Sequence, residues 1–214
     1  MELKRLTFYL DFISPYAYLA FERLPQVLQG ISHAVTYQPV LFASMLKAHG
    51  TIGPAELAPK RDWTYRHVLW LAQAQGTPMQ MPAAHPFNPL PLLRLALACS
   101  SDGTPNRWVC ESIFRHVWAQ GGDPVDAQRL AELTERLKPS LDPAGEAVKA
   151  LLKDRSEQAI AQGVFGVPTI ETEGKLFWGL DALPMLRDHL LGGPWFAGSH
   201  WDAATQVPVG IRRS

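Results

Sequence analysis

Cysteine is scarce in this chain of 214 residues, which contains only two, Cys99 and Cys110. They form no CxxC motif and no His–Cys pattern at metal-ligand spacing, so the sequence offers neither a disulfide framework nor a cysteine zinc site. The seven histidines form no HxxH or HExxH pattern either. We therefore expect reduced thiols and no bound metal.

Net charge and long apolar runs are also lacking. Lys and Arg together number 20, as do Asp and Glu, and the Arg212-Arg213 pair is too short for a nucleic-acid site. No stretch reaches the roughly 20 apolar residues of a membrane helix. A charged residue interrupts the N-terminal apolar stretch before a signal-peptide core forms. We expect a cytoplasmic protein without a nucleic-acid or membrane partner.

The composition is that of a globular protein, with 47% hydrophobic and 19% charged residues. Residues 6–12 alternate apolar and polar side chains, which predicts a strand. Ser14-Pro15 is typical of a helix start, and an apolar-rich segment runs to about Leu28 before Gly30 ends it. Residues 34–41 predict a second strand with Pro39 near its end. The chain therefore begins as a βαβ unit.

The middle of the chain is rich in Ala, Leu, Gln, Arg and Glu, and it predicts about five helices over 60–75, 89–101, 106–119, 126–137 and 144–162. Strand patterns return at 168–172 and 175–178, and a helix follows over about 181–191. The predicted fold class is α/β, a thioredoxin-like fold interrupted by a large helical insertion. Its parts are a core of residues 1–57 and 163–192, an insertion of 58–162 and a C-terminal tail of 193–214.

Ser14 lies where the first strand ends and a helix begins, in the segment Asp11-Phe12-Ile13-Ser14-Pro15-Tyr16-Ala17. Free N–H groups and the positive end of the helix dipole favour an anion there, and thioredoxins place a reactive cysteine at this location. Positions 14 and 17 carry no sulfur, which excludes internal thiol–disulfide exchange. The Ser14 hydroxyl either donates to a thiolate supplied by a ligand or only caps the helix.

Two further motifs come late in the chain. Gly163-Val164-Phe165-Gly166-Val167-Pro168-Thr169 places a candidate cis peptide before a strand, where the backbone of Val167 could pair with a peptide-like ligand. Trp178-Gly179-Leu180-Asp181 leads into the last core helix. Asp181 either caps that helix, meets the ammonium group of a ligand, or does both.

In this order, the three motifs resemble those of the 2-hydroxychromene-2-carboxylate isomerases, a family close to the kappa-class glutathione transferases within the DsbA-like thioredoxin superfamily. The resemblance spans roughly residues 5–192. It implies glutathione as the cofactor, a small aromatic acid as the substrate and a homodimer. Ser14 would be the catalytic hydroxyl beside the glutathione sulfur. The resemblance further implies glutathione-binding residues Thr51, Val167, Pro168, Gly179, Leu180, Asp181 and Ala182, and substrate-binding residues Tyr16, Lys60 and Asn88.

The chain departs from the family pattern at several positions. Thr51 falls where relatives often have asparagine, and Leu180 falls where a polar residue commonly accompanies the Asp. His67 and Trp70 replace an Asp and an Arg on the first insertion helix, a change that concerns the substrate more than glutathione.

The resemblance implies an isomerase of an aromatic keto acid, of the type that converts 2-hydroxychromene-2-carboxylate to trans-o-hydroxybenzylidenepyruvate, with glutathione thiolate as a transient nucleophile. A kappa-type transferase that conjugates glutathione to electrophiles is an alternative. A non-enzymatic, peptide-binding DsbA-like protein is another, although the joint presence of all three motifs argues against it.

Overall fold

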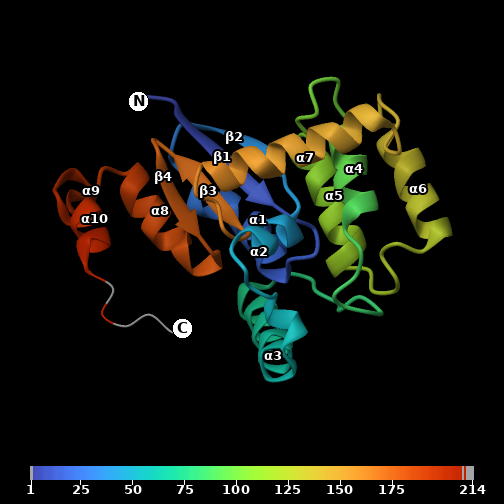
Figure 1. Cartoon of the computed structure of the whole chain (residues 1–214), viewed down its shortest axis with the longest axis horizontal. Helices are drawn as coiled ribbons and strands as arrows, with labels where there is room; N and C mark the ends of the chain where they lie inside the picture. The colour runs from blue at the N-terminus through green and yellow to red at the C-terminus, as the bar shows by residue number, and fades with distance from the viewer. Residues whose placement is uncertain (1, 209, 211–214) are drawn as a thin grey trace.

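The computed structural model describes residues 2–208 and 210, so Arg212-Arg213 and the end of the predicted tail lie outside the described residues. Its centre is a four-stranded sheet with the strand order β2-β1-β3-β4 (Figure 1). Strand β1 (Lys4–Leu10) is parallel to β2 (His33–Pro39) and antiparallel to β3 (Thr169–Thr172), which is antiparallel to β4 (Lys175–Trp178). Both ends of the chain thus build one mixed sheet, and the predicted thioredoxin-like α/β fold is confirmed.

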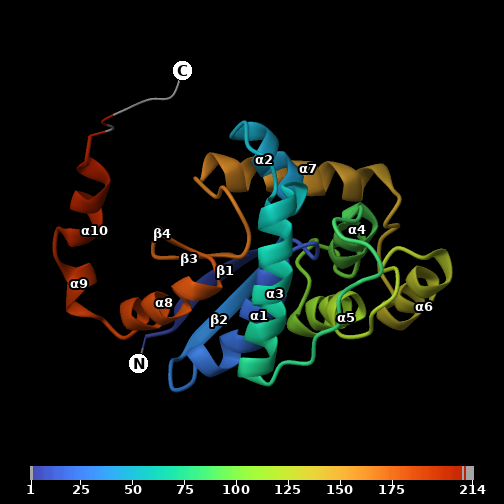
Figure 2. The same ribbon diagram turned by 90° about the horizontal axis from the view of Figure 1, so that it is seen from below.

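Helices cover both faces of this sheet. Helix α7 (Glu146–Ala161) lies over one face, and α1 (Pro15–Val27) and α8 (Leu183–Leu190) lie over the other (Figure 2). The far side of α1 is covered in turn by α3 (Ala58–Gln75) and α5 (Arg107–Trp118). Because α1 is covered on both sides, its first half is buried on nearly all sides, whereas Arg23, Pro25 and Gln26 in its second half are exposed.

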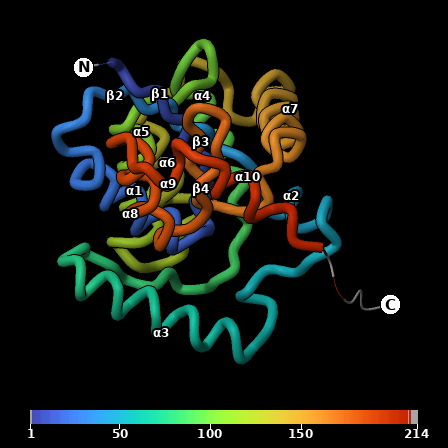
Figure 3. Tube along the Cα trace, turned by 90° about the vertical axis from the view of Figure 1, so that its left-hand side faces the viewer, coloured from blue at the N-terminus to red at the C-terminus, as the bar shows by residue number. Residues whose placement is uncertain are grey.

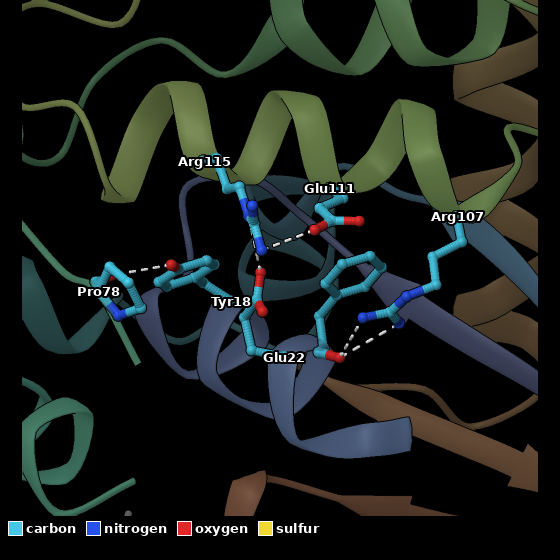
Figure 4. A network of polar contacts seen from close by, with 7 residues as sticks. Tyr18, Glu22, Pro78, Arg107, Glu111 and Arg115 are labelled. Carbon is cyan, nitrogen blue, oxygen red and sulfur yellow. Dashed lines mark hydrogen bonds and ion pairs between the residues drawn. The ribbon is translucent and has the colours of Figure 1, made fainter. Parts of the chain in front are cut away.

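Polar contacts link α1 to the helices inserted between the two halves of the core (Figure 4). Arg115 of α5 pairs with Glu22 of α1 at 3.5 Å and with Glu111 at 2.7 Å. The Arg107 guanidinium lies 4.1 Å from the centre of the Phe21 ring. The Tyr18 hydroxyl donates to the Pro78 carbonyl at 2.6 Å. These contacts attach α1, which begins just after Ser14, to α5 and to the segment that follows α3.

The predicted pattern of elements is confirmed, with shifted ends. The inserted helices are α3, α4 (Leu90–Ala98), α5, α6 (Ala127–Leu137) and α7. Strand β1 begins earlier than the predicted 6–12, since Lys4 and Arg5 already pair with β2. It also ends earlier, because Asp11 starts a turn that the Ser14 N–H closes by donating to the Asp11 carbonyl at 3.1 Å.

Among the short elements that sequence periodicity missed are helix α2 (Phe42–Ala48) and the 3-10 turn η1 (Pro54–Glu56). The first N–H of α2, on Phe42, donates to the Asp11 carboxylate at 2.9 Å. A cap so distant in sequence leaves no local signal of the kind that marks most helix starts.

The described part of the tail packs on the core and lies toward the viewer in Figure 3. It forms α9 (Pro194–Ala197), α10 (His200–Ala203) and the turn η3 (Ala204–Gln206). The rings of Phe196 and Trp201 lie 6.1 and 5.6 Å from that of Phe177 in β4. The tail therefore extends the apolar core beyond the sheet edge.

Both cysteines are free, as expected, with Cys110 buried and Cys99 partly buried. Burial raises the pKa of the Cys99 thiol to about 11. Among the described residues, no helix combines the length and the apolar character that crossing a membrane requires.

Candidate active site

Ser14 is the N-cap of α1 and also faces the loop before β3. Its backbone is extended, with φ −90° and ψ 114°, and its Oγ accepts a hydrogen bond from the Ala17 N–H at 3.2 Å. The hydroxyl donates to the Val167 carbonyl at 3.3 Å. The predicted capping role is thus confirmed. The second bond is long for an O–H donor, so the Ser14 proton can turn to a stronger acceptor at little cost.

Val167 offers a backbone donor and acceptor beside Ser14. The Val167-Pro168 peptide is cis, as the sequence suggested. Within the described residues, the Val167 N–H has no hydrogen-bond partner, and the Val167 carbonyl has only the Ser14 hydroxyl. A peptide-like ligand alongside this residue could pair with both groups. The Pro168 carbonyl accepts from the Gly179 N–H at 2.9 Å, which brings the Gly179–Asp181 segment close by.

Two cavities meet at this point. The first, of about 810 Å³, includes Val167, Pro168, Gly179, Leu180 and Asp181 in its lining. The second, of about 900 Å³, is lined by Ser14, Thr51, Lys60 and a mostly apolar set of neighbours. Tyr16, Val167 and Trp178 line both cavities. A ligand along Val167 would therefore place one end in the first cavity and its middle beside Ser14.

The structure brings together all but two of the predicted site residues. Ala182 lines neither cavity and precedes the first residue of α8. Asn88 also lines neither cavity, and its side-chain oxygen accepts from the Leu90 N–H at 3.1 Å, at the start of α4. The geometry therefore gives these two residues no direct place in the site.

Asp181 does not cap the last core helix, so that interpretation of the sequence is wrong. A 3-10 turn, η2 (Leu180–Ala182), intervenes before α8, and the Asp181 carboxylate forms no side-chain cap bond. Gly179 has φ +97°, and a Cβ there would collide with this carboxylate. Only glycine suits such a close approach at this φ. The result is an exposed carboxylate at the first cavity, available to a cationic group.

Sequence reasoning missed the aromatic walls of the second cavity and its histidine. Trp63, Phe165 and Trp178 are exposed large side chains that line it, and the Phe165 and Trp178 rings lie 4.8 Å apart. His85 also lines it, from the loop between α3 and α4. The proline-rich context of His85-Pro86-Phe87 was the one available signal, because it marks a loop with fixed geometry.

Charges in the second cavity are few. Within the described chain, Lys60 is the only Lys or Arg of its lining, and its side chain is exposed. Asp11 also lines the cavity but is fully buried, and this burial raises the pKa of its carboxyl to about 7, against the opposing effect of backbone N–H donors. Glu56 also lines the cavity, and its carboxylate accepts from the Gly53 N–H at 2.6 Å. The mostly apolar lining therefore carries both an anionic and a cationic side chain near its surface.

Tyr16 and His67 form a polar pair at the first cavity, with 2.9 Å between the Tyr16 hydroxyl and the His67 Nδ1. Burial raises the pKa of Tyr16. His67 stacks between the indoles of Trp63 and Trp70, at 5.8 and 6.4 Å. Trp70 itself lines neither cavity. Across the described residues, no group of three or more His, Cys, Asp or Glu side chains is arranged to hold a metal ion.

Comparison with known proteins identifies the family and the fold of the chain. Residues 5–191 match the family model of the DSBA-like thioredoxin domain. The 2-hydroxychromene-2-carboxylate isomerase of Sphingobium xenophagum is 28% identical over 210 residues, which cover 88% of this chain and 98% of that protein. Glutathione S-transferase kappa 1 of Rattus norvegicus is 24% identical over 208 residues, covering 89% and 92%.

A solved structure of 2-hydroxychromene-2-carboxylate isomerase superposes with a TM-score of 0.77 at 24% identity, covering 95% of this chain and 100% of that one. At this identity the superposition supports the fold alone. The sequence relatives are isomerases and glutathione transferases, so both comparisons agree with the resemblance inferred from the motifs.

Proposed function

The chain belongs to the DSBA-like thioredoxin domain family, and we propose that it is a glutathione-dependent isomerase of a small aromatic keto acid, of the 2-hydroxychromene-2-carboxylate type. The observation that carries this proposal is the position of the Ser14 hydroxyl. It lies at the N-terminus of α1, opposite the Val167 backbone and in the lining of a large apolar cavity. The isomerases and kappa-class transferases among its relatives support the same reaction class.

The residues present fit glutathione. The free N–H and the weakly held carbonyl of Val167 suit the cysteinyl backbone of the tripeptide. The exposed Asp181 carboxylate at the first cavity suits the γ-glutamyl ammonium group. When bound, glutathione would supply a thiolate nucleophile that adds reversibly to an activated double bond.

Ser14 would stabilise the charged form of that sulfur. A hydrogen bond to a charged group contributes about 1.5–3 kcal/mol, and a helix N-terminus contributes about 0.3–1 kcal/mol. Together these effects would lower the pKa of a neighbouring thiol by roughly 1–3 units. The long bond from Ser14 to the Val167 carbonyl is the one that the hydroxyl would exchange for the sulfur.

The second cavity would hold the substrate. Trp63, Phe165 and Trp178 offer ring faces to an aromatic group, and Lys60 offers a cation to a carboxylate. Tyr16, at the junction of the cavities, would lie between the substrate and the cofactor. The apolar walls would exclude water while the carbon–carbon bond rotates.

The test follows both the substrate and the cofactor. Purified protein is mixed with an o-hydroxybenzylidenepyruvate-type substrate and glutathione, and the substrate spectrum and total free glutathione are recorded together. We expect turnover that requires glutathione and leaves its concentration unchanged. Loss of one glutathione per product would indicate the transferase instead. An absence of turnover together with an absence of glutathione binding in calorimetry would contradict both assignments.

A further inference from the structure

We propose that His85 is a positioning residue for Ser14: its imidazole holds the peptide group that precedes Ser14 and so fixes the point from which the Ser14 side chain extends. The catalytic consequence rests on the proposed function. The geometric part concerns this chain alone and can be tested without glutathione.

The turn that leads to Ser14 is held by side chains from two distant parts of the chain. Trp118 of α5 donates its indole N–H to the Phe12 carbonyl at 2.9 Å. His85 Nε2 lies 2.8 Å from the Ile13 carbonyl. Within the turn, the Asp11 carboxylate accepts from the Ile13 N–H at 3.1 Å. Both carbonyls immediately before Ser14 are therefore satisfied by inserted segments rather than by the core.

The hydrogen bonds define the tautomer of His85. A carbonyl oxygen only accepts, so Nε2 carries the proton that bonds to Ile13. The Tyr65 hydroxyl lies 2.8 Å from Nδ1 and 2.8 Å from the His85 carbonyl, so it is a donor shared between them. Burial lowers the pKa of His85, which favours the neutral ring. The ring thus has one N–H group, and it is directed at the Ile13 carbonyl.

This contact acts on Ser14 because the peptide bond is planar. The Ile13 carbonyl and the Ser14 N–H belong to the same peptide group. His85 holds the carbonyl end, and the Asp11 carbonyl holds the N–H end at 3.1 Å. With both ends held, the Cα of Ser14 and the point from which its side chain extends are set. The ring of His85 is itself packed against Trp118, with 5.5 Å between centres.

The first experiment replaces Ser14 by a reporter thiol and needs no ligand. In a Ser14→Cys background, ultraviolet absorbance of the thiolate is followed against pH. A cysteine held at a helix N-terminus titrates below the usual pKa of about 8.5. Cys99 and Cys110 do not interfere, because burial raises the pKa of both thiols.

We compare three changes at position 85 with a matched control. The amide N–H of His85→Gln can replace Nε2–H, whereas the shorter His85→Asn and the apolar His85→Leu leave the Ile13 carbonyl without a donor. The control is His116→Leu, because His116 is also a buried histidine whose Nε2 lies 2.9 Å from a carbonyl, that of Pro124, but it lines neither cavity.

We expect Asn and Leu to reduce the thiolate fraction of the reporter thiol at fixed pH about tenfold, equivalent to one unit of pKa. Gln and the His116 control should leave it within about twofold of the background. The Gln–Asn pair keeps the test decisive if the Leu variant folds poorly. Equal titration curves for Gln and Asn would overturn the inference.

The second experiment measures turnover in the protein that keeps Ser14, with substitutions at position 85 alone. His85→Asn should lower kcat about tenfold while the KM for glutathione stays within about twofold, and His85→Gln should recover most of the rate. An unchanged kcat in His85→Asn would contradict the positioning role. If the wild-type protein shows no glutathione-dependent turnover, the proposed function fails, whereas the titration of the reporter thiol still decides the inference.

Discussion

Replacement of Ser14 by alanine and by glycine separates its structural role from its proposed chemical role. The side chain caps α1 through the Ala17 N–H and donates to the Val167 carbonyl. Loss of an N-cap to alanine costs about 1 kcal/mol, whereas glycine at the same position costs only a few tenths. Loss of the long bond to Val167 adds roughly 0.5 kcal/mol in both variants.

The two variants should therefore differ in stability but not in activity. For a chain of this size, a loss of about 1 kcal/mol lowers Tm by about 2–4 °C. We expect a fall of about 3–6 °C for Ser14→Ala and a clearly smaller one for Ser14→Gly. Both variants lack the hydroxyl, so both should lose about 1.5–3 kcal/mol of thiolate stabilisation, or roughly ten- to a hundredfold in rate.

The assays are thermal melting, ultraviolet titration of bound glutathione thiolate against pH, and turnover on an o-hydroxybenzylidenepyruvate-type substrate. Glutathione affinity below the thiol pKa should stay nearly constant, because the tripeptide is held elsewhere. If Ser14→Gly keeps the wild-type thiol pKa and rate while Ser14→Ala does not, Ser14 acts only as a helix cap. Wild-type behaviour in both variants would refute the reasoning entirely.

Three further predictions concern other residues. Asp181→Ala should weaken glutathione binding by about 1.5–3 kcal/mol without lowering Tm, because the carboxylate is exposed and caps no helix; unchanged affinity in calorimetry would remove Asp181 from the site. Asp11 has a folded pKa of about 7 against an ordinary value of 3.8, so the folded state binds more protons between these values. The free energy of unfolding should accordingly fall as pH rises from about 4 to 7, by up to roughly 4 kcal/mol, and Asp11→Asn should flatten this slope in urea titrations. In an insulin-reduction assay, the protein and its Cys99→Ser/Cys110→Ser variant should both be inactive, and activity that disappears with the cysteines would contradict this.

The sequence by itself determined those features whose causes are local. The alternation of apolar and polar side chains predicts β1, and a serine followed by a proline predicts the start of α1 at Ser14. The Val167-Pro168 peptide is different, because it became a candidate cis bond only once the pattern of elements had indicated a thioredoxin-like core. The signals for β1 and for the start of α1 lie within a few residues of their effects, so no tertiary information was needed for these two elements.

Only the tertiary structure decided the features that depend on distant partners. Helix α2 escapes prediction because its first N–H is capped by Asp11 from another element. The sequence allows Asp181 a capping role because a 3-10 turn that offsets the helix start has no clear sequence signal. His85 looks like one of several scattered histidines, since its partner, the Ile13 carbonyl, is 72 positions away. Hydrogen bonds between remote segments form only when the sheet and the inserted helices pack together. A local sequence pattern does not show which remote segments will become neighbours.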